Sequence, residues 1–175
     1  KNAQRLLLLV NQLMDLQKNQ SGTMELQVTE NNVYEFVTEI YCAFNQIAQT
    51  NEITFTLDCR DREFQAWYDK VLLEKVVFNL LSNAFKYTPS GKDIRMLVKC
   101  IPAGELEELY RKDVAPSALY MMLQVVDAGC GIPPQERDKV FTPFYRVPET
   151  AGVNVPGTGI GLSLVYSIVK LHKGV

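Results

Sequence analysis

The chain has 175 residues, of which 47% are hydrophobic and 22% charged, enough for one domain with a buried core. Because 18 Lys and Arg oppose 20 Asp and Glu, the formal net charge is −2, which excludes a chain-wide basic field for nucleic acid but not a local patch. The longest aliphatic run, Leu6 to Val10, is far shorter than the roughly 20 residues of a membrane helix and carries no signal-peptide cleavage site.

Residues 3–18 contain neither Gly nor Pro and predict a helix. Its leucines recur at spacings of three and four: Leu6, Leu9, Leu13 and Leu16. The pattern fits two heptads of a coiled coil, and it fits a helix packed on its own domain equally well. Ser21-Gly22 ends this segment.

The rest of the chain alternates short strands with helices and predicts an α/β (α+β) two-layer sandwich, a mixed β-sheet with three helices on one face. Strands are expected at 24–28, 53–57, 64–68, 93–101 and 118–126, and helices at about 33–48, 70–86 and 160–171. Thr29 to Asn32 supply capping residues for the first of these helices, and Asp69 caps the second. Residues 128–158 predict a long loop of the kind that usually carries function, and the polar stretch before residue 118 predicts a hairpin excursion.

The few cysteine and histidine residues limit which metal sites and catalytic sites the chain can form. Cys42, Cys59, Cys100 and Cys130 show no C-x-x-C spacing, so we expect free thiols in a reducing compartment. His172 is the one histidine, which leaves too few ligands for a dedicated zinc site and excludes a Ser/His/Asp triad unless His172 is the base. Because it stands at a predicted helix C-terminus, where a cation is favoured, we expect a structural role for it.

Three polar residues form a stripe on the predicted helix 70–86. Asn79, Asn83 and Lys86 are spaced i, i+4 and i+7, which places them on one narrow face at the edge of the core. Two carboxamide oxygens and an ammonium suit Mg²⁺ with phosphates, because Mg²⁺ prefers oxygen ligands and lysine supplies a point charge. A solvated helix face would show the same pattern.

A carboxylate follows the apolar strand that ends near residue 126. Asp127 precedes Ala128-Gly129-Cys130-Gly131-Ile132. The carboxylate can accept the exocyclic amine of adenine, which guanine would not offer there, and Gly129 and Gly131 allow the backbone to approach a flat ring. The alternative is a strand that ends in an Asp-Gly turn.

A glycine-rich segment, Gly157-Thr158-Gly159-Ile160-Gly161-Leu162, opens the last predicted helix. Free amides and the helix dipole at such a place favour an anion. Leu162 replaces the last glycine of a dinucleotide-binding fingerprint, and the chain has no Walker loop. A glycine-rich hinge is the alternative reading.

Taken together and in this order, these segments resemble the four motif boxes of the ATP-binding domain of bacterial sensor histidine kinases. The N box is similar to residues 79–89, the D-x-G-x-G-I box to 127–132, the F box to 141–146, and the G-T-G-x-G-L box to 157–162. The resemblance extends over the whole chain. It implies that residues 1–20 end the second helix of a dimerisation hairpin, most like that of hybrid sensors, and that residues 21–175 form the catalytic domain with an ATP lid at about 133–158.

The resemblance also implies residue roles. Asn83 would hold Mg²⁺, Asn79 and Lys86 would face the phosphates of ATP as the catalytic pair, and Asp127 would select adenine. The remaining implied nucleotide contacts are Tyr87, Gly129, Gly131 and Ile132 around the base, and Arg146, Gly157, Thr158, Gly159, Gly161 and Leu162 around the phosphates. Phe141 and Phe144 would anchor the lid on the core or on the dimerisation helices.

The chain departs from the family pattern at two places. Ala128 stands where a threonine is common, which removes a hydroxyl contact. The phosphoacceptor histidine of the dimerisation domain is absent, so this chain should not autophosphorylate alone and is expected to be a fragment of a longer kinase. In the related gyrase, mismatch-repair and heat-shock ATPases a glutamate that activates water stands where Asn79 is, and an asparagine cannot act as that base.

The function implied by the resemblance is binding of Mg-ATP and transfer of its γ-phosphoryl group to a histidine. The expected partners are the dimerisation domain of the same kinase, a second copy in the full-length homodimer and a downstream receiver domain, with no direct nucleic acid binding. The expected location is the cytoplasmic part of a membrane-anchored sensor. A degenerate, non-catalytic docking module and an anti-sigma-type serine kinase of the same fold are alternatives, the latter needing no dimerisation helix.

Overall fold

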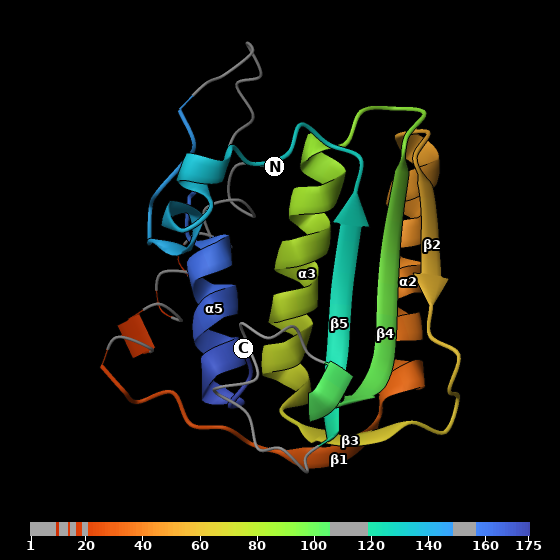
Figure 1. The fold of residues 1–175 in the computed structure, drawn as a ribbon, viewed down its shortest axis with the longest axis vertical. Coiled ribbons are helices and arrows are strands. Elements are labelled where there is room, and N and C mark those ends of the chain that lie inside the picture. The colour runs from red at the N-terminus through yellow and green to blue at the C-terminus, as the bar shows by residue number, and fades with distance from the viewer. Residues whose placement is uncertain (1–9, 11–13, 15–16, 19–20, 106–118, 149–156) are drawn as a thin grey trace.

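The structure, a computed structural model, describes residues 10, 14, 17–18, 21–105, 119–148 and 157–175 (Figure 1). The described helices are α2 (Val33–Thr50), α3 (Lys70–Tyr87) and α5 (Gly161–Leu171), and the strands are β1 (Thr29–Asn32), β2 (Thr54–Asp58), β3 (Gln65–Tyr68), β4 (Asp93–Pro102) and β5 (Leu119–Asp127). Short 3-10 turns follow at η1 (Ala103–Glu105), η2 (Pro134–Glu136) and η3 (Lys139–Phe141). No helix among these residues is long and apolar enough to cross a membrane.

The described strands form two sheets. β1 and β3 make an antiparallel pair, and a three-stranded sheet has the order β2-β4-β5, with β2 parallel and β5 antiparallel to β4. The parallel pair needs a crossover, which β3 and α3 supply. α2 and α3 pack on the sheet, and α5 lies beside α3 (Figure 1). The predicted α+β layering with a mixed sheet is confirmed.

The core lies between the sheet and the apolar faces of α2 and α3. On α2 the buried side chains recur at helical spacing: Val33, Phe36, Val37, Ile40, Phe44 and Ala48. Phe85 of α3 stacks on Phe44 with ring centroids 5.5 Å apart and meets Phe55 of β2 edge-on at 5.3 Å. These contacts hold α3, with its polar stripe, against the sheet.

Both long helices begin at capped residues, as predicted. Asn32 Oδ1 accepts a hydrogen bond from Glu35 N at 2.9 Å, and Asp69 Oδ1 accepts one from Leu72 N at 3.0 Å. Each side chain satisfies an amide that has no partner within its own helix. α3 ends at Tyr87, just before Thr88-Pro89, because the residue before a proline avoids the helical region.

The strand predicted at residues 24–28 was wrong, and β1 lies immediately after it. Met24 and Leu26 pack against the core from an extended segment that joins no ladder. The amide of Gln27 donates instead to the Asp69 carboxylate at 2.9 Å. The alternation therefore records burial of one side of the segment, not strand pairing.

The other predicted elements begin and end within two residues of those observed. The helix predicted at residues 3–18 lies largely outside the described residues, although Val10, Met14, Gln17 and Lys18 are described as helical. Most of the expected hairpin excursion, and residues 149–156 of the expected lid, also lie outside them.

Candidate functional site

The polar stripe of α3 faces the beginning of α5. Asn79 Nδ2 donates to the carbonyl of Lys75 at 2.7 Å, which orients the carboxamide. Its Oδ1 lies so close to Gly161 that a Cβ added there would be 2.6 Å away. The first residue of α5 therefore meets the middle of α3 through a glycine with no side chain.

Lys86 continues this contact toward the end of α3. Its Nζ donates to the Tyr87 hydroxyl at 3.0 Å and lies 4.7 Å from the centroid of that ring. A Cβ added at Gly157 would be 2.6 Å from the same ammonium. The two ends of the glycine-rich segment thus lie against Asn79 and Lys86, while Asn83 is half-buried on the turn between them.

Ile160, the residue before α5, makes no side-chain hydrogen bond to the first turn of the helix. Thr158 Oγ1 accepts from Ile160 N at 3.3 Å. Amides of the first helical turn have no intrahelical acceptor, and the helix dipole adds positive potential there. With the Lys86 ammonium beside it, this end of α5 favours an anionic ligand.

The glycine-rich segment is joined to the loop that precedes it. The Phe144 amide donates to the Gly159 carbonyl at 2.9 Å. Gly159 has φ +72°, and a Cβ there would lie 2.6 Å from the Phe144 carbonyl carbon. Both the backbone conformation and the close approach require glycine. The sequence analysis did not predict this junction. Gly159 was the residue in the sequence that could have indicated it.

Asp127 lies at the exposed end of β5, next to the end of α3. Its Oδ1 accepts from Gly129 N at 2.9 Å, and a Cβ at Gly129 would lie 2.7 Å from the Tyr87 carbonyl oxygen. The Asp-Gly turn considered as an alternative is therefore present. A carboxylate offers about four acceptor sites, so this turn leaves acceptor capacity for a ligand.

The described part of the expected lid is anchored at several points. Phe141 contacts α5, with its ring centroid 5.7 Å from that of Tyr166, and both Phe141 and Phe144 are exposed. The Tyr145 hydroxyl hydrogen bonds to the Glu136 carboxylate, and this bond, followed by burial and the negative charge, raises the pKa of Tyr145. The Glu136–Tyr145 bond was not predicted, since no spacing pattern indicates it.

Other predicted residues lie on exposed segments of the chain. Gly131, Ile132 and Arg146 are exposed in the segments after β5 and after η3. Gly131 has φ +69°, and a Cβ added there would meet nothing within 4 Å, so its backbone conformation, not crowding, requires glycine. Leu162 is half-buried in the first turn of α5.

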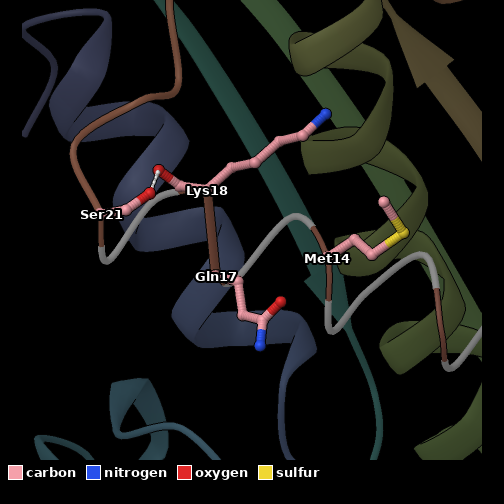
Figure 2. Close-up of a pocket in the computed structure, with 4 residues that line it drawn as sticks. All are labelled: Met14, Gln17, Lys18 and Ser21. Carbon is pink, nitrogen blue, oxygen red and sulfur yellow. Dashed lines mark hydrogen bonds between the residues drawn. The ribbon is translucent and has the colours of Figure 1, made fainter.

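Two hollows lie elsewhere on the described part of the chain. One, of about 550 Å³, is lined by Met14, Gln17, Lys18 and Ser21, with the Ser21 hydroxyl donating to the Lys18 carbonyl (Figure 2). The other, of about 440 Å³, lies by the ends of β2 and β4 and includes Asp58 and Lys99. Neither contains a predicted residue. We place the candidate site at the α3–α5–β5 junction, where a cation, uncapped amides and a carboxylate converge.

Comparison with known proteins agrees with this fold. The family model described as "Histidine kinase-, DNA gyrase B-, and HSP90-like ATPase" matches residues 68–175. The solved structure of the histidine kinase AdeS from Acinetobacter baumannii superposes with a TM-score of 0.68 at 21% identity, covering 97% of this chain and 68% of that one.

Two curated relatives match almost the whole chain. Histidine kinase P4 of Formosa agariphila is 34% identical over 179 residues, which cover 99% of this chain and 12% of that protein. Sensor histidine kinase WalK of Bacillus subtilis is 29% identical over 171 residues, which cover 98% of this chain and 26% of that protein. The chain thus spans a small part of each relative. Because the family model matches well over half of it, the chain belongs to the histidine kinase-, DNA gyrase B- and HSP90-like ATPase family.

Proposed function

We propose that the chain binds Mg-ATP at the α3–α5–β5 junction and presents its γ-phosphoryl group to a histidine on the dimerisation domain of a longer sensor kinase. The observation that carries the proposal is the pairing of Asn79 with Gly161 and of Lys86 with Gly157 at the uncapped end of α5. The absent Cβ atoms let Asn79 and Lys86 lie against the backbone at the start of α5. The amides of that helix end would bind oxygens of a polyphosphate, and the ammonium supplies the opposing charge.

The base end of the proposed site is β5. Asp127 would accept the exocyclic amine of adenine with the acceptor capacity that its turn leaves free. Gly129 brings the backbone after β5 against the Tyr87 carbonyl, so the Tyr87 ring and the carboxylate lie at neighbouring ends of α3 and β5. Gly131 and Ile132 follow as the exposed wall of the base pocket, and Arg146 would approach the phosphates from the lid.

The donor set fits a magnesium ion that is bound with the nucleotide. Asn83, half-buried between Asn79 and Lys86, would offer a neutral carboxamide oxygen, and the phosphates would supply the charged ligands. When bound, the ion would neutralise charge on the transferring group. Asn79 orients and does not remove a proton from water, because a carboxamide is not a base. The residues would therefore position the phosphoryl group and protect it from hydrolysis.

The acceptor would be a histidine outside this chain. His172 is the single histidine, and both of its ring nitrogens are hydrogen bonded, to Asp69 N at 3.1 Å and to the Ile168 carbonyl at 2.8 Å. A dimerisation domain of the same kinase in a homodimer, and then a receiver domain, are the proposed partners. The relatives named as sensor kinases support a place on the cytoplasmic side of a membrane-anchored parent.

The test is calorimetric titration with a non-hydrolysable ATP analogue and with GTP, each with and without Mg²⁺. We expect adenine-selective, magnesium-dependent binding that is lost in Asn83→Ala. Asn45→Ala is the matched control, because Asn45 is a half-buried asparagine on α2, away from the junction. Unchanged affinity in Asn83→Ala would remove the proposed metal ligand.

Absence of binding to the folded wild-type chain at millimolar nucleotide would overturn the proposal. It would instead favour the non-catalytic docking module, which Ala128 in place of the common threonine mildly supports. Phosphorylation of a separately added dimerisation domain tests the second half of the proposal, and transfer to a serine instead would favour the serine kinase.

A further inference from the structure

Asp69 is a buried carboxylate that the proposed chemistry does not use. Asp69 is only 6% exposed, and both oxygens of its carboxylate accept backbone hydrogen bonds. Oδ1 accepts from Leu72 N at 3.0 Å as the cap of α3, and Oδ2 accepts from Gln27 N at 2.9 Å. One carboxylate thus ties the segment that leads into β1 to the first turn of α3.

The backbone of the same residue is bound to the far end of α5. The Asp69 amide donates to His172 Nε2 at 3.1 Å, and His172 Nδ1 lies 2.8 Å from the Ile168 carbonyl oxygen. A carbonyl only accepts, so Nδ1 carries the hydrogen, and Nε2 must present its lone pair to the amide. The geometry assigns His172 as the neutral imidazole protonated at Nδ1.

These bonds and the Asn79–Gly161 contact lie at opposite ends of α5. α3 and α5 run side by side (Figure 1), with Asp69 at the start of α3 meeting His172 at the end of α5, and Asn79 in the middle of α3 meeting Gly161 at the start of α5. Ten residues of α-helix separate Asp69 from Asn79, a span of about 15 Å. A slide of one residue would move α5 by about 1.5 Å, enough to break the bond at His172 and to change the contact at Gly161.

We propose that Asp69 and His172 are positioning residues that set the register of α5 on α3, and through it the place of the uncapped α5 amides opposite Asn79. The proposal rests on the proposed function, since it is the binding of the nucleotide phosphates that the register would serve. The Gln27 bond joins the segment before β1 to the same cluster. A displacement of that segment would therefore disturb the Asp69 cap of α3.

The first experiment compares His172→Ala with His172→Gln. The alanine variant loses the acceptor for the Asp69 amide, and we expect its affinity for the non-hydrolysable ATP analogue to fall about tenfold, the equivalent of one hydrogen bond. Glutamine can place a carbonyl oxygen near the position of Nε2, so it should restore affinity to within about twofold. Equal affinity of His172→Ala and wild type would overturn the proposal, as would failure of glutamine to rescue.

A control variant separates positioning from general loss of stability. Asn32→Ala removes the cap of α2, a comparable helix cap on a helix that holds none of the candidate residues. We expect a similar fall in the urea midpoint and unchanged nucleotide affinity. If Asn32→Ala loses as much affinity as His172→Ala, the effect is global and the positioning role is wrong.

Two ligand-free readouts distinguish this proposal from the proposed function. Imidazole ¹⁵N spectra of the wild type should show Nδ1 protonated and Nε2 unprotonated. Amide hydrogen exchange at Leu164, whose amide donates to the Ile160 carbonyl at 3.0 Å, should be faster in His172→Ala than in Asn32→Ala, whether or not nucleotide binds. The opposite tautomer, or equal exchange in the two variants, would refute the register even if ATP binds. If both signatures are found but the wild type binds no nucleotide, only the proposed function is refuted.

Discussion

Asn79 and Gly161 meet so closely that the Asn79 Oδ1 atom lies 2.6 Å from the point where a Cβ would stand on Gly161. This contact joins the middle of α3 to the first residue of α5. The Asn79 carboxamide is oriented by its hydrogen bond to the Lys75 carbonyl. The close approach is possible because Gly161 has no side chain.

Gly161→Ala should therefore weaken nucleotide binding while the fold is retained. The added methyl group would push aside the Asn79 carboxamide, which is the end of a side chain and can rotate, so the expected cost is a misplaced site and an affinity loss of about tenfold. Calorimetry with the ATP analogue measures it. Gly104→Ala, where a Cβ would meet nothing within 4 Å, is the matched control and should bind like wild type.

Lys86→Met tests the phosphate end of the site. Loss of a charge-assisted contact costs about 1.5 to 3 kcal/mol, so ATP affinity should fall by at least about tenfold while adenosine affinity stays the same. Titrations with ATP, ADP and adenosine distinguish the two. The exposed Lys92, in the turn before β4, supplies the control Lys92→Met. An equal loss for adenosine and ATP would place Lys86 away from the phosphates.

Asp127→Asn tests the base end without disturbing the turn. The amide oxygen of asparagine can still accept from Gly129 N, which the carboxylate does now at 2.9 Å. One oxygen becomes an NH₂ group, however, and cannot accept the adenine amine. We expect weaker ATP binding and a smaller preference of ATP over GTP in competition titrations. Full retention of both would remove Asp127 from the site.

Gly159→Ala and Gly91→Ala separate backbone strain from crowding. Both glycines have positive φ, +72° and +76°, but a Cβ at Gly159 would lie 2.6 Å from the Phe144 backbone, whereas at Gly91 it would meet nothing within 4 Å. Gly91→Ala should cost about 1 to 2 kcal/mol of conformational strain. Gly159→Ala should cost more and should break the Phe144–Gly159 bond. Urea unfolding and the exchange rate of the Phe144 amide measure the two effects, and equal costs would contradict the crowding.

The raised pKa of Tyr68 predicts a loss of stability at alkaline pH. Burial, and secondarily the charge of Glu39, raise the pKa of Tyr68 from 10 to about 12. Between these values the unfolded chain has lost the phenolic proton and the native chain has kept it, so the free energy of unfolding falls as the pH rises from 10 to 12. Below pH 10 both states are protonated and Tyr68 adds no slope. Tyr68→Phe should flatten this alkaline slope in urea unfolding and match the wild-type slope at neutral pH.

Much of the fold could be predicted because the signals are local. The spacing of apolar residues on α2 and α3 and the caps at Asn32 and Asp69 follow from the needs of a single helix. The strand predicted at residues 24–28 shows the limit of such signals. Alternation there reports that Met24 and Leu26 face the core, but the amide of Gln27 bonds to a carboxylate and not to a strand.

The site divides in the same way. Sequence alone determined which residue types stand in the four motif boxes, and so which side chains carry charge, accept hydrogen bonds or leave room for a close approach. Only the tertiary structure decided that Asn79 meets Gly161, that Lys86 meets Gly157, and that Asp69 meets His172 from a distance of 103 positions along the chain. The physical reason is that helix and turn preferences act over a few residues, whereas these contacts depend on how α3 and α5 pack side by side.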